Sequence, residues 1–153
     1  MKARPYPRWI SRAFIFATTM LAFTGLLQMP LAKRYYLTEL PGMAWTGDFF
    51  FVHKLHYMLA ALLLFVTALV VIHWVIDWHD SLRLTTLGRV RAGVLAGVVI
   101  SGGLRVYRNM PDITLDPMLI VTIEWVHMTL AVALGVLALI ALVRKSSAYA
   151  VRK

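Results

Sequence analysis

An unbroken apolar run constrains the fold of this chain more than any other feature. From Phe49 to Ile76 the basic side chains are Lys54 and three histidines, and there is no acidic side chain. At about 1.5 Å per residue, a helix over this run is about 40 Å long, which exceeds the ~30 Å hydrocarbon thickness of a bilayer. The run therefore predicts a transmembrane helix.

Three other segments of the chain are also long and apolar. The whole sequence has 153 residues and is 60% hydrophobic. A soluble domain of this size does not contain several apolar runs near twenty residues long. We therefore predict one all-α domain over residues 1–153, an integral membrane four-helix bundle with helices at about 9–29, 49–78, 89–107 and 118–143.

The third predicted helix is the weakest span. Its uncharged part, Ala92–Leu104, is short, so Arg91 and Arg105 must extend their head groups toward the two membrane surfaces. Small residues recur along this helix at a spacing of four and form a stripe of Gly93, Gly97 and Ser101. Such a stripe lets another helix backbone or a flat cofactor approach closely, and both interpretations stay open.

The basic residues predict the orientation in the membrane. If the four helices cross in succession, eleven of the 16 lysine and arginine residues lie on the side of the N-terminus. Cytoplasmic segments of membrane proteins carry such an excess. We predict cytoplasmic N- and C-termini and place the starts of the second and fourth helices on the outer side. The basic tail after Val143 is expected to be loosely ordered.

The composition excludes several kinds of site. The chain has no cysteine, which excludes disulfides, iron–sulfur clusters and covalently attached c-type haem. Its formal net charge of +9 comes from basic residues scattered at helix ends, a pattern typical of membrane topology and not of nucleic-acid binding. The sequence shows no nucleophile–base pair, so we assign no catalytic residues.

Two histidines lie deep within predicted helices. His56 is about 10 Å from the outer end of the second helix, and His127 is about 14 Å from the outer end of the fourth. Each is followed one turn later by an alanine, Ala60 or Ala131, which leaves room for a porphyrin edge. Facing helices build cofactor sites in this way, and neutral imidazole binds haem iron. We predict that both are ligands of one haem b; the structural alternative is hydrogen bonding to a neighbouring helix.

Three more basic groups lie near the same outer side. His53 precedes His56 by three residues, and Arg105 and Arg108 lie at the end of the third helix. We predict that these groups contact the haem propionates; the alternative for His53 is a polar contact with the electron-donor protein. The simpler alternative for the arginines is that their side chains extend to the membrane surface without binding a cofactor.

Glu124 lies one turn before His127 in an otherwise apolar helix. A carboxylate inside a membrane is a functional candidate by default. Glu124 can exchange a proton with a quinone, orient a ligand histidine, or pair with Arg105 or Arg108. His73 and Asp77, near the inner end of the second helix, are candidates for a quinone or proton site, for a second haem, or for a polar interface.

With these features, the chain resembles the membrane cytochrome b subunits of bacterial respiratory enzymes, namely formate dehydrogenase gamma subunits and the cytochrome b subunits of nickel–iron hydrogenases. The resemblance covers the four-helix layout and includes Arg8–Trp9, Thr24–Gly25 and one histidine on each of the second and fourth helices. It implies that an outer haem b is held by His56 and His127. The family's inner haem uses histidines that this chain lacks, so one haem is expected, with a second only near His73.

The resemblance also implies a function. A chain of this kind is a membrane anchor and electron-transfer subunit in the bacterial inner membrane. It passes electrons between an outer-side partner, an iron–sulfur or cytochrome c subunit, and the quinone pool. It is part of a multi-subunit oxidoreductase and not a complete enzyme. The alternative is a non-redox membrane anchor or assembly subunit whose histidines are structural.

Overall fold

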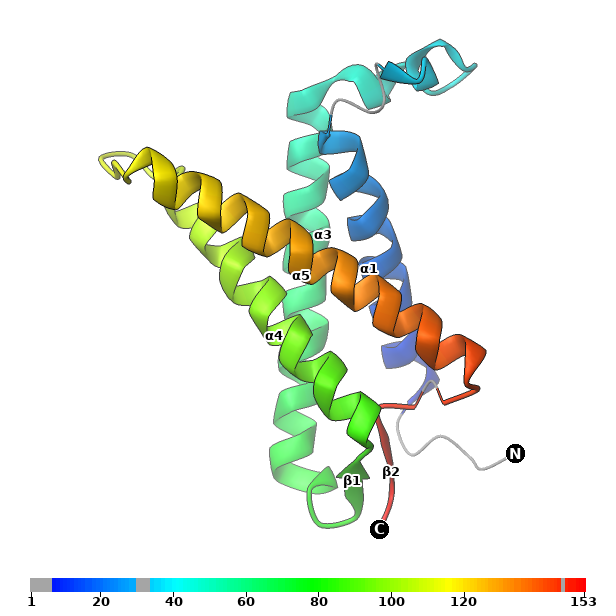
Figure 1. The fold of residues 1–153 in the computed structure, drawn as a ribbon. Helices are drawn as coiled ribbons and strands as arrows, with labels where there is room; N and C mark the ends of the chain where they lie inside the picture. The colour runs from blue at the N-terminus through cyan, green and yellow to red at the C-terminus, as the bar shows by residue number, and fades with distance from the viewer. Residues whose placement is uncertain (1–6, 30–33, 147) are drawn as a thin grey trace. The chain divides into compact units, whose positions relative to one another are not determined.

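The computed structural model describes residues 7–29, 34–146 and 148–153, and four long helices dominate it (Figure 1). Each is long and apolar enough to cross a membrane. The prediction of an all-α fold with four such helices is therefore confirmed. The helices are α1 (Arg8–Gln28), α3 (Phe49–His73), α4 (Thr86–Tyr107) and α5 (Pro117–Val143).

The chain forms two compact units, which divide between His79 and Asp80. In the first unit α1 packs against α3, and in the second α4 packs against α5. Each unit is an antiparallel helical hairpin, because the chain reverses direction in the loop that joins its two helices. We call them the first and second hairpins.

The loop of the first hairpin contains two short 3₁₀ helices and packs over the helix ends. Leu27 of α1 and Val52 of α3 form a buried apolar cluster, and Leu37 and Trp45 of the loop pack against it. The Asp48 side chain accepts a hydrogen bond from the backbone N–H of Phe51 at 3.0 Å, which satisfies one of the exposed donors at the start of α3. The loop therefore closes one end of the hairpin with apolar side chains.

The second predicted helix does not stay α-helical to its predicted end. The α-helical part of α3 stops at His73, and a π-helical turn follows at Trp74–Trp78. Together the two parts cover the predicted range of 49–78. A π turn widens the helix by one residue, and such turns are frequent at functional sites.

Capping side chains fix the starts of both helices in the second hairpin. Thr85 accepts a hydrogen bond from the Gly88 N–H at 2.9 Å, so α4 begins three residues before the predicted start at Arg89. Asp116 accepts from the N–H of Met118 at 2.8 Å, and Pro117 occupies the first turn of α5. The weak third span is therefore a full-length helix.

The prediction of a loosely ordered tail was wrong. Strand β1 (Leu82–Leu84) pairs antiparallel with strand β2 (Ala150–Arg152) of the tail. The carbonyl of Tyr149 accepts the N–H of Thr85 at 2.9 Å, and the Arg91 guanidinium lies 4.0 Å from the centre of the Tyr149 ring. A side chain at Gly88 would collide with the Tyr149 carbonyl, so glycine is required for this close approach. Backbone pairing and a cation–π contact thus hold the tail at the start of α4.

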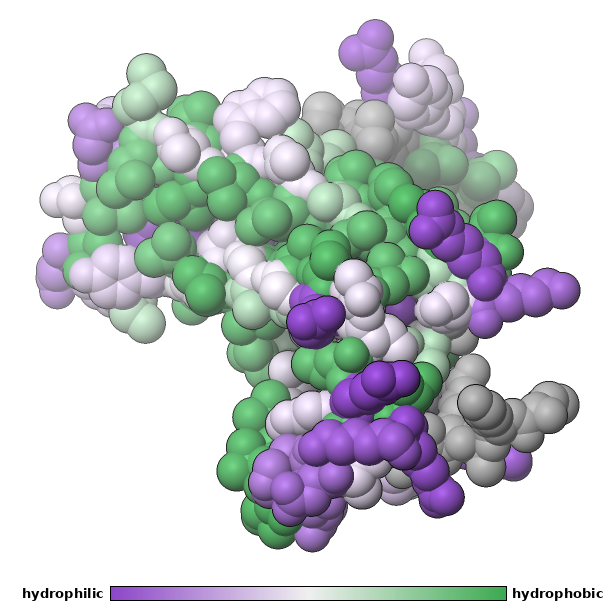
Figure 2. Space-filling model, turned by 60° about the horizontal axis from the view of Figure 1, so that its bottom comes forward, coloured by the Kyte–Doolittle hydropathy of each residue, from purple (hydrophilic) through white to green (hydrophobic). Residues whose placement is uncertain are grey.

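Most of the helix surface is apolar and exposed. On the face shown in Figure 2, hydrophobic side chains cover much of the molecule. The exposed side chains include Phe50 at 76% and Val143 at 83% exposure. Exposed apolar surface on this scale is unfavourable in water but suits lipid. Together with the four long apolar helices, this makes the chain a multi-pass membrane protein.

Candidate functional site

His56 is bound to a hydroxyl on the neighbouring helix. Its Nδ1 lies 2.8 Å from Oγ1 of Thr24, which is 1% exposed. Thr24 Oγ1 also lies 2.9 Å from the carbonyl of Met20, one turn earlier in α1. A hydroxyl has one proton to donate, either to this carbonyl or to the imidazole. When the carbonyl receives it, Thr24 accepts the Nδ1–H of His56, in the tautomer that has its lone pair on Nε2.

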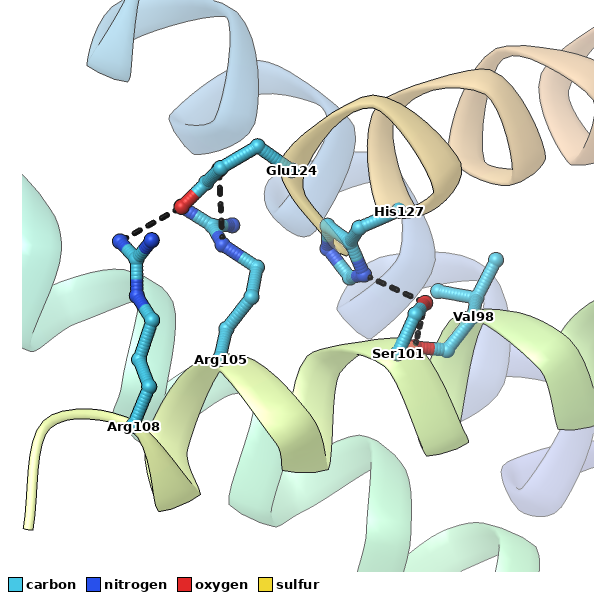
Figure 3. A network of polar contacts seen from close by, with 6 residues as sticks. All are labelled: Val98, Ser101, Arg105, Arg108, Glu124 and His127. Carbon is cyan, nitrogen blue, oxygen red and sulfur yellow. Dashed lines mark hydrogen bonds and ion pairs between the residues drawn. The ribbon is translucent and has the colours of Figure 1, made fainter. Parts of the chain in front are cut away.

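His127 has the same arrangement in the second hairpin. Its Nδ1 lies 3.0 Å from Oγ of Ser101, and Ser101 Oγ lies 3.1 Å from the carbonyl of Val98 (Figure 3). The carbonyl of Gly97, one turn earlier in α4, lies 2.8 Å from the same oxygen. Ser101 is 4% exposed, so little water competes for these bonds. When the Ser101 proton goes to a backbone carbonyl in the same way, Ser101 accepts the Nδ1–H of His127, and the lone pair of the ring is on Nε2.

A glycine follows each hydroxyl residue and contacts the histidine ring. A Cβ on Gly25 would lie 3.6 Å from Cε1 of His56, and a Cβ on Gly102 would lie 3.2 Å from Cε1 of His127. The second distance is shorter than ordinary van der Waals contact, so a side chain at Gly102 would push the ring away. The two glycines therefore allow the imidazoles to lie close to the neighbouring helix backbone.

The two hairpins thus repeat one local constellation. Thr24–Gly25 of α1 faces His56 of α3, and Ser101–Gly102 of α4 faces His127 of α5. The sequence singled out both histidines and Thr24–Gly25, but it did not predict that a hydroxyl–glycine pair faces each histidine. The signal that was available is a Ser/Thr–Gly pair near the end of the helix that precedes each histidine helix.

The small-residue stripe on α4 divides between two roles. A Cβ on Gly97 would lie 3.0 Å from Cδ1 of Leu130, so Gly97 lets α5 pack closely. Ser101, one turn later, is the partner of His127. Nothing lies within 4 Å of the corresponding position at Gly93. Of the two interpretations left open by the sequence, helix packing applies at Gly97.

Glu124 is paired with both arginines at the end of α4. Its Oε2 lies 3.1 Å from Nε of Arg105, and its Oε1 lies 2.6 Å from an Nη of Arg108, as Figure 3 shows. The structure shows the arginine pair, which is one of the three roles considered from the sequence. The oxygen that pairs with His127 Nδ1 belongs to Ser101 and not to Glu124. Two guanidinium groups and one carboxylate leave the cluster with a net positive charge.

The remaining candidate residues lie at the two ends of α3. The His53 ring stacks on Phe49 with centroids 5.6 Å apart and contacts Tyr57 at 4.4 Å. At the other end, His73 Nδ1 lies 3.2 Å from Oδ2 of Asp77. The His73 ring also stacks on the ring of Trp78 at 5.3 Å, so the π turn brings the His73–Asp77 pair against an aromatic face.

His56 and His127 fit a metal that is already held in a cofactor, such as haem iron, better than a metal ion that is held only by protein side chains. Among the described residues, no three His, Asp or Glu side chains converge on one point. Haem iron takes four of its ligands from the porphyrin and needs only one or two from the protein. Single histidines that are oriented through Nδ1 therefore fit haem, whereas zinc needs three or four protein ligands.

No family model matches this chain, and no curated protein or solved structure matches it either. The fold and the sequence together define a multi-pass α-helical membrane protein. In each of its hairpins, one histidine lies beside a hydroxyl group of the neighbouring helix.

Proposed function

We propose that this chain is a haem b-binding membrane anchor and electron-transfer subunit of a respiratory oxidoreductase, with His56 and His127 as the axial ligands. The observation that carries the proposal is the repeated constellation, in which each hairpin places Nδ1 of one histidine against a buried hydroxyl. Metal-ligating histidines commonly donate their other ring N–H to an acceptor that fixes the ring orientation. Both histidines have such an acceptor.

The other residues have distinct tasks in this proposal. Haem b supplies one-electron redox chemistry when it is bound. Arg105 and Arg108, with their net positive charge over Glu124, attract the propionates, and His53 is the third contact. The apolar helix surfaces exclude water from the ligands. His73 and Asp77 remain the candidates for a quinone, a proton path or a second haem.

The proposed setting is the bacterial inner membrane. The chain passes electrons between an outer-side iron–sulfur or cytochrome c subunit and the quinone pool. A non-redox anchor or assembly subunit is the second candidate, because both histidines already have hydroxyl partners within their own hairpins. Such hydrogen bonds also stabilise membrane helix pairs without any cofactor.

The visible spectrum of the purified chain separates these two candidates. We expect a reduced-minus-oxidised spectrum of low-spin haem b, with one haem per chain by pyridine haemochrome and protein mass. One haem is expected because no histidine of the first, third or fourth helix lies at the depth of His73 to serve as a second ligand there. A preparation supplied with haem that shows no such spectrum contradicts the redox function and favours the anchor. Two haems per chain contradict the single site.

The proposed orientation has its own test. If the four helices cross the membrane in succession, both termini lie on one side, and the lysine and arginine excess assigns that side to the cytoplasm. We expect a fluorescent reporter that folds only in the cytoplasm to be active when it is fused after Lys153. Activity of a periplasmic reporter at the same position would reverse the orientation and move the haem to the other side.

A further inference from the structure

Thr24 and Ser101 differ from the other hydroxyl residues of these helices. Thr18 of α1 and Thr122 of α5 bond the carbonyl one turn earlier, at 2.7 and 2.8 Å from Phe14 and Met118. Thr24 and Ser101 make the same backbone bond but also face a histidine. The hydrogen bond from a helix hydroxyl to the carbonyl one turn earlier therefore forms without a nearby imidazole. The histidine contacts of Thr24 and Ser101 are an additional feature of these two residues.

Each hydroxyl lies within hydrogen-bond distance of backbone carbonyls as well as of an imidazole. When Thr24 and Ser101 donate to those carbonyls, the lone pairs of their oxygens are left for the Nδ1–H groups. Both hydroxyl residues are nearly fully buried, at 1% and 4% exposure. In a dry environment such a bond is stronger than in water and polarises its neighbours. Each imidazole thus donates to an oxygen that is neutral and fixed.

From this geometry we infer that Thr24 and Ser101 are positioning residues that set the ring orientation of the two ligands and the electron density at their Nε2 atoms. The inference rests on the proposed haem function and deepens it. An acceptor on Nδ1–H makes an imidazole more basic at Nε2, which favours the ferric over the ferrous state. Removal of the acceptor therefore raises the midpoint potential.

The positions of the hydroxyls also limit how far the rings turn. Gly25 and Gly102 hold the backbone at the Cε1 edge of each ring, and the hydroxyl lies at Nδ1. A hydrogen bond at Nδ1 together with a backbone close to Cε1 restricts the rotation of the ring more than the hydrogen bond alone does. Ligand-plane orientation alters the spectrum of a low-spin bis-histidine haem, so a second readout besides the potential is available.

The test uses the full chain, purified in detergent with its haem. We expect Thr24→Val and Ser101→Ala to retain haem, to raise the midpoint potential, and to shift the ferric electron paramagnetic resonance signal. Thr24→Val keeps the side-chain shape, and Thr24→Ser and Ser101→Thr restore the hydroxyl and the original potential. The double variant is expected to show the sum of the two shifts, because the two hydroxyls act on separate ligands.

Thr18→Val and Thr122→Val are the matched controls, because each removes a hydroxyl bonded to a backbone carbonyl but not to a histidine. We expect neither to change the potential. An unchanged potential and resonance signal in both Thr24→Val and Ser101→Ala would overturn the inference and leave the haem proposal intact. Equal shifts in the controls would also overturn it. Absence of haem from the wild-type chain would instead remove the proposed function itself.

Discussion

Replacement of His127 by alanine is expected to abolish haem b binding, with essentially complete loss of the low-spin spectrum. The same is expected for His56→Ala. The reason is that each hairpin supplies one of the two imidazoles, and alanine offers no ligand. The measurement is haem content per chain by pyridine haemochrome, with membrane insertion verified by the amount of folded protein after gel filtration.

Two further histidine variants serve as controls for this result. His53→Ala is expected to keep the bis-histidine spectrum, because His53 lies among the rings of Phe49 and Tyr57 and has no ligand role in the proposal. His79→Ala, at an exposed position beyond α3, is also expected to keep it. A low-spin bis-histidine spectrum that persists in His127→Ala would remove the assignment of the ligands.

Replacement of Glu124 by glutamine is expected to destabilise the second hairpin by about 1–2 kcal/mol. The change removes the charge that lies between Arg105 and Arg108, 3.1 and 2.6 Å away. The magnitude is moderate because the Glu124 side chain is 36% exposed. The measurement is thermal unfolding in detergent, and Glu39→Gln, at an exposed loop position, is the matched control.

The same variant distinguishes the structural role of Glu124 from a role in proton transfer. Glutamine keeps the size and hydrogen bonding of the side chain but cannot titrate. If Glu124 is also the proton-exchanging group, Glu124→Gln lowers the thermal stability and in addition slows electron exchange with a soluble quinol analogue. The ion pairs predict lower stability and an unchanged rate, and in that case His73 and Asp77 become the next candidates for the quinone.

The sequence predicted the helices well because long apolar runs have few alternatives in a membrane. The ranges 49–78 and 118–143 agree with the observed helices to within a residue or two. Helix α4 was placed three residues late, since the cap made by Thr85 is a local hydrogen bond and not a hydropathy signal. The tail was misjudged because its strand has few apolar residues, and its order depends on pairing with residues 82–84.

The candidate site was predicted in part. His56 and His127 were singled out because an unpaired imidazole is costly in lipid. Their partners were not predicted, because Thr24 and Ser101 precede them by 32 and 26 positions. Glu124 was recognised as unusual, yet its two ion pairs with Arg105 and Arg108 were only one of three options.

The sequence alone determined that this chain is a helical membrane protein, because the cost of exposing peptide groups to lipid leaves a long apolar run one stable form, the helix. It also determined which ionisable groups lie within the membrane. The tertiary structure decided which atoms meet: Nδ1 of each histidine with a hydroxyl, and Glu124 with two guanidiniums. Such contacts depend on helix rotation and register, which hydropathy does not encode, since nearly every face of these helices is apolar.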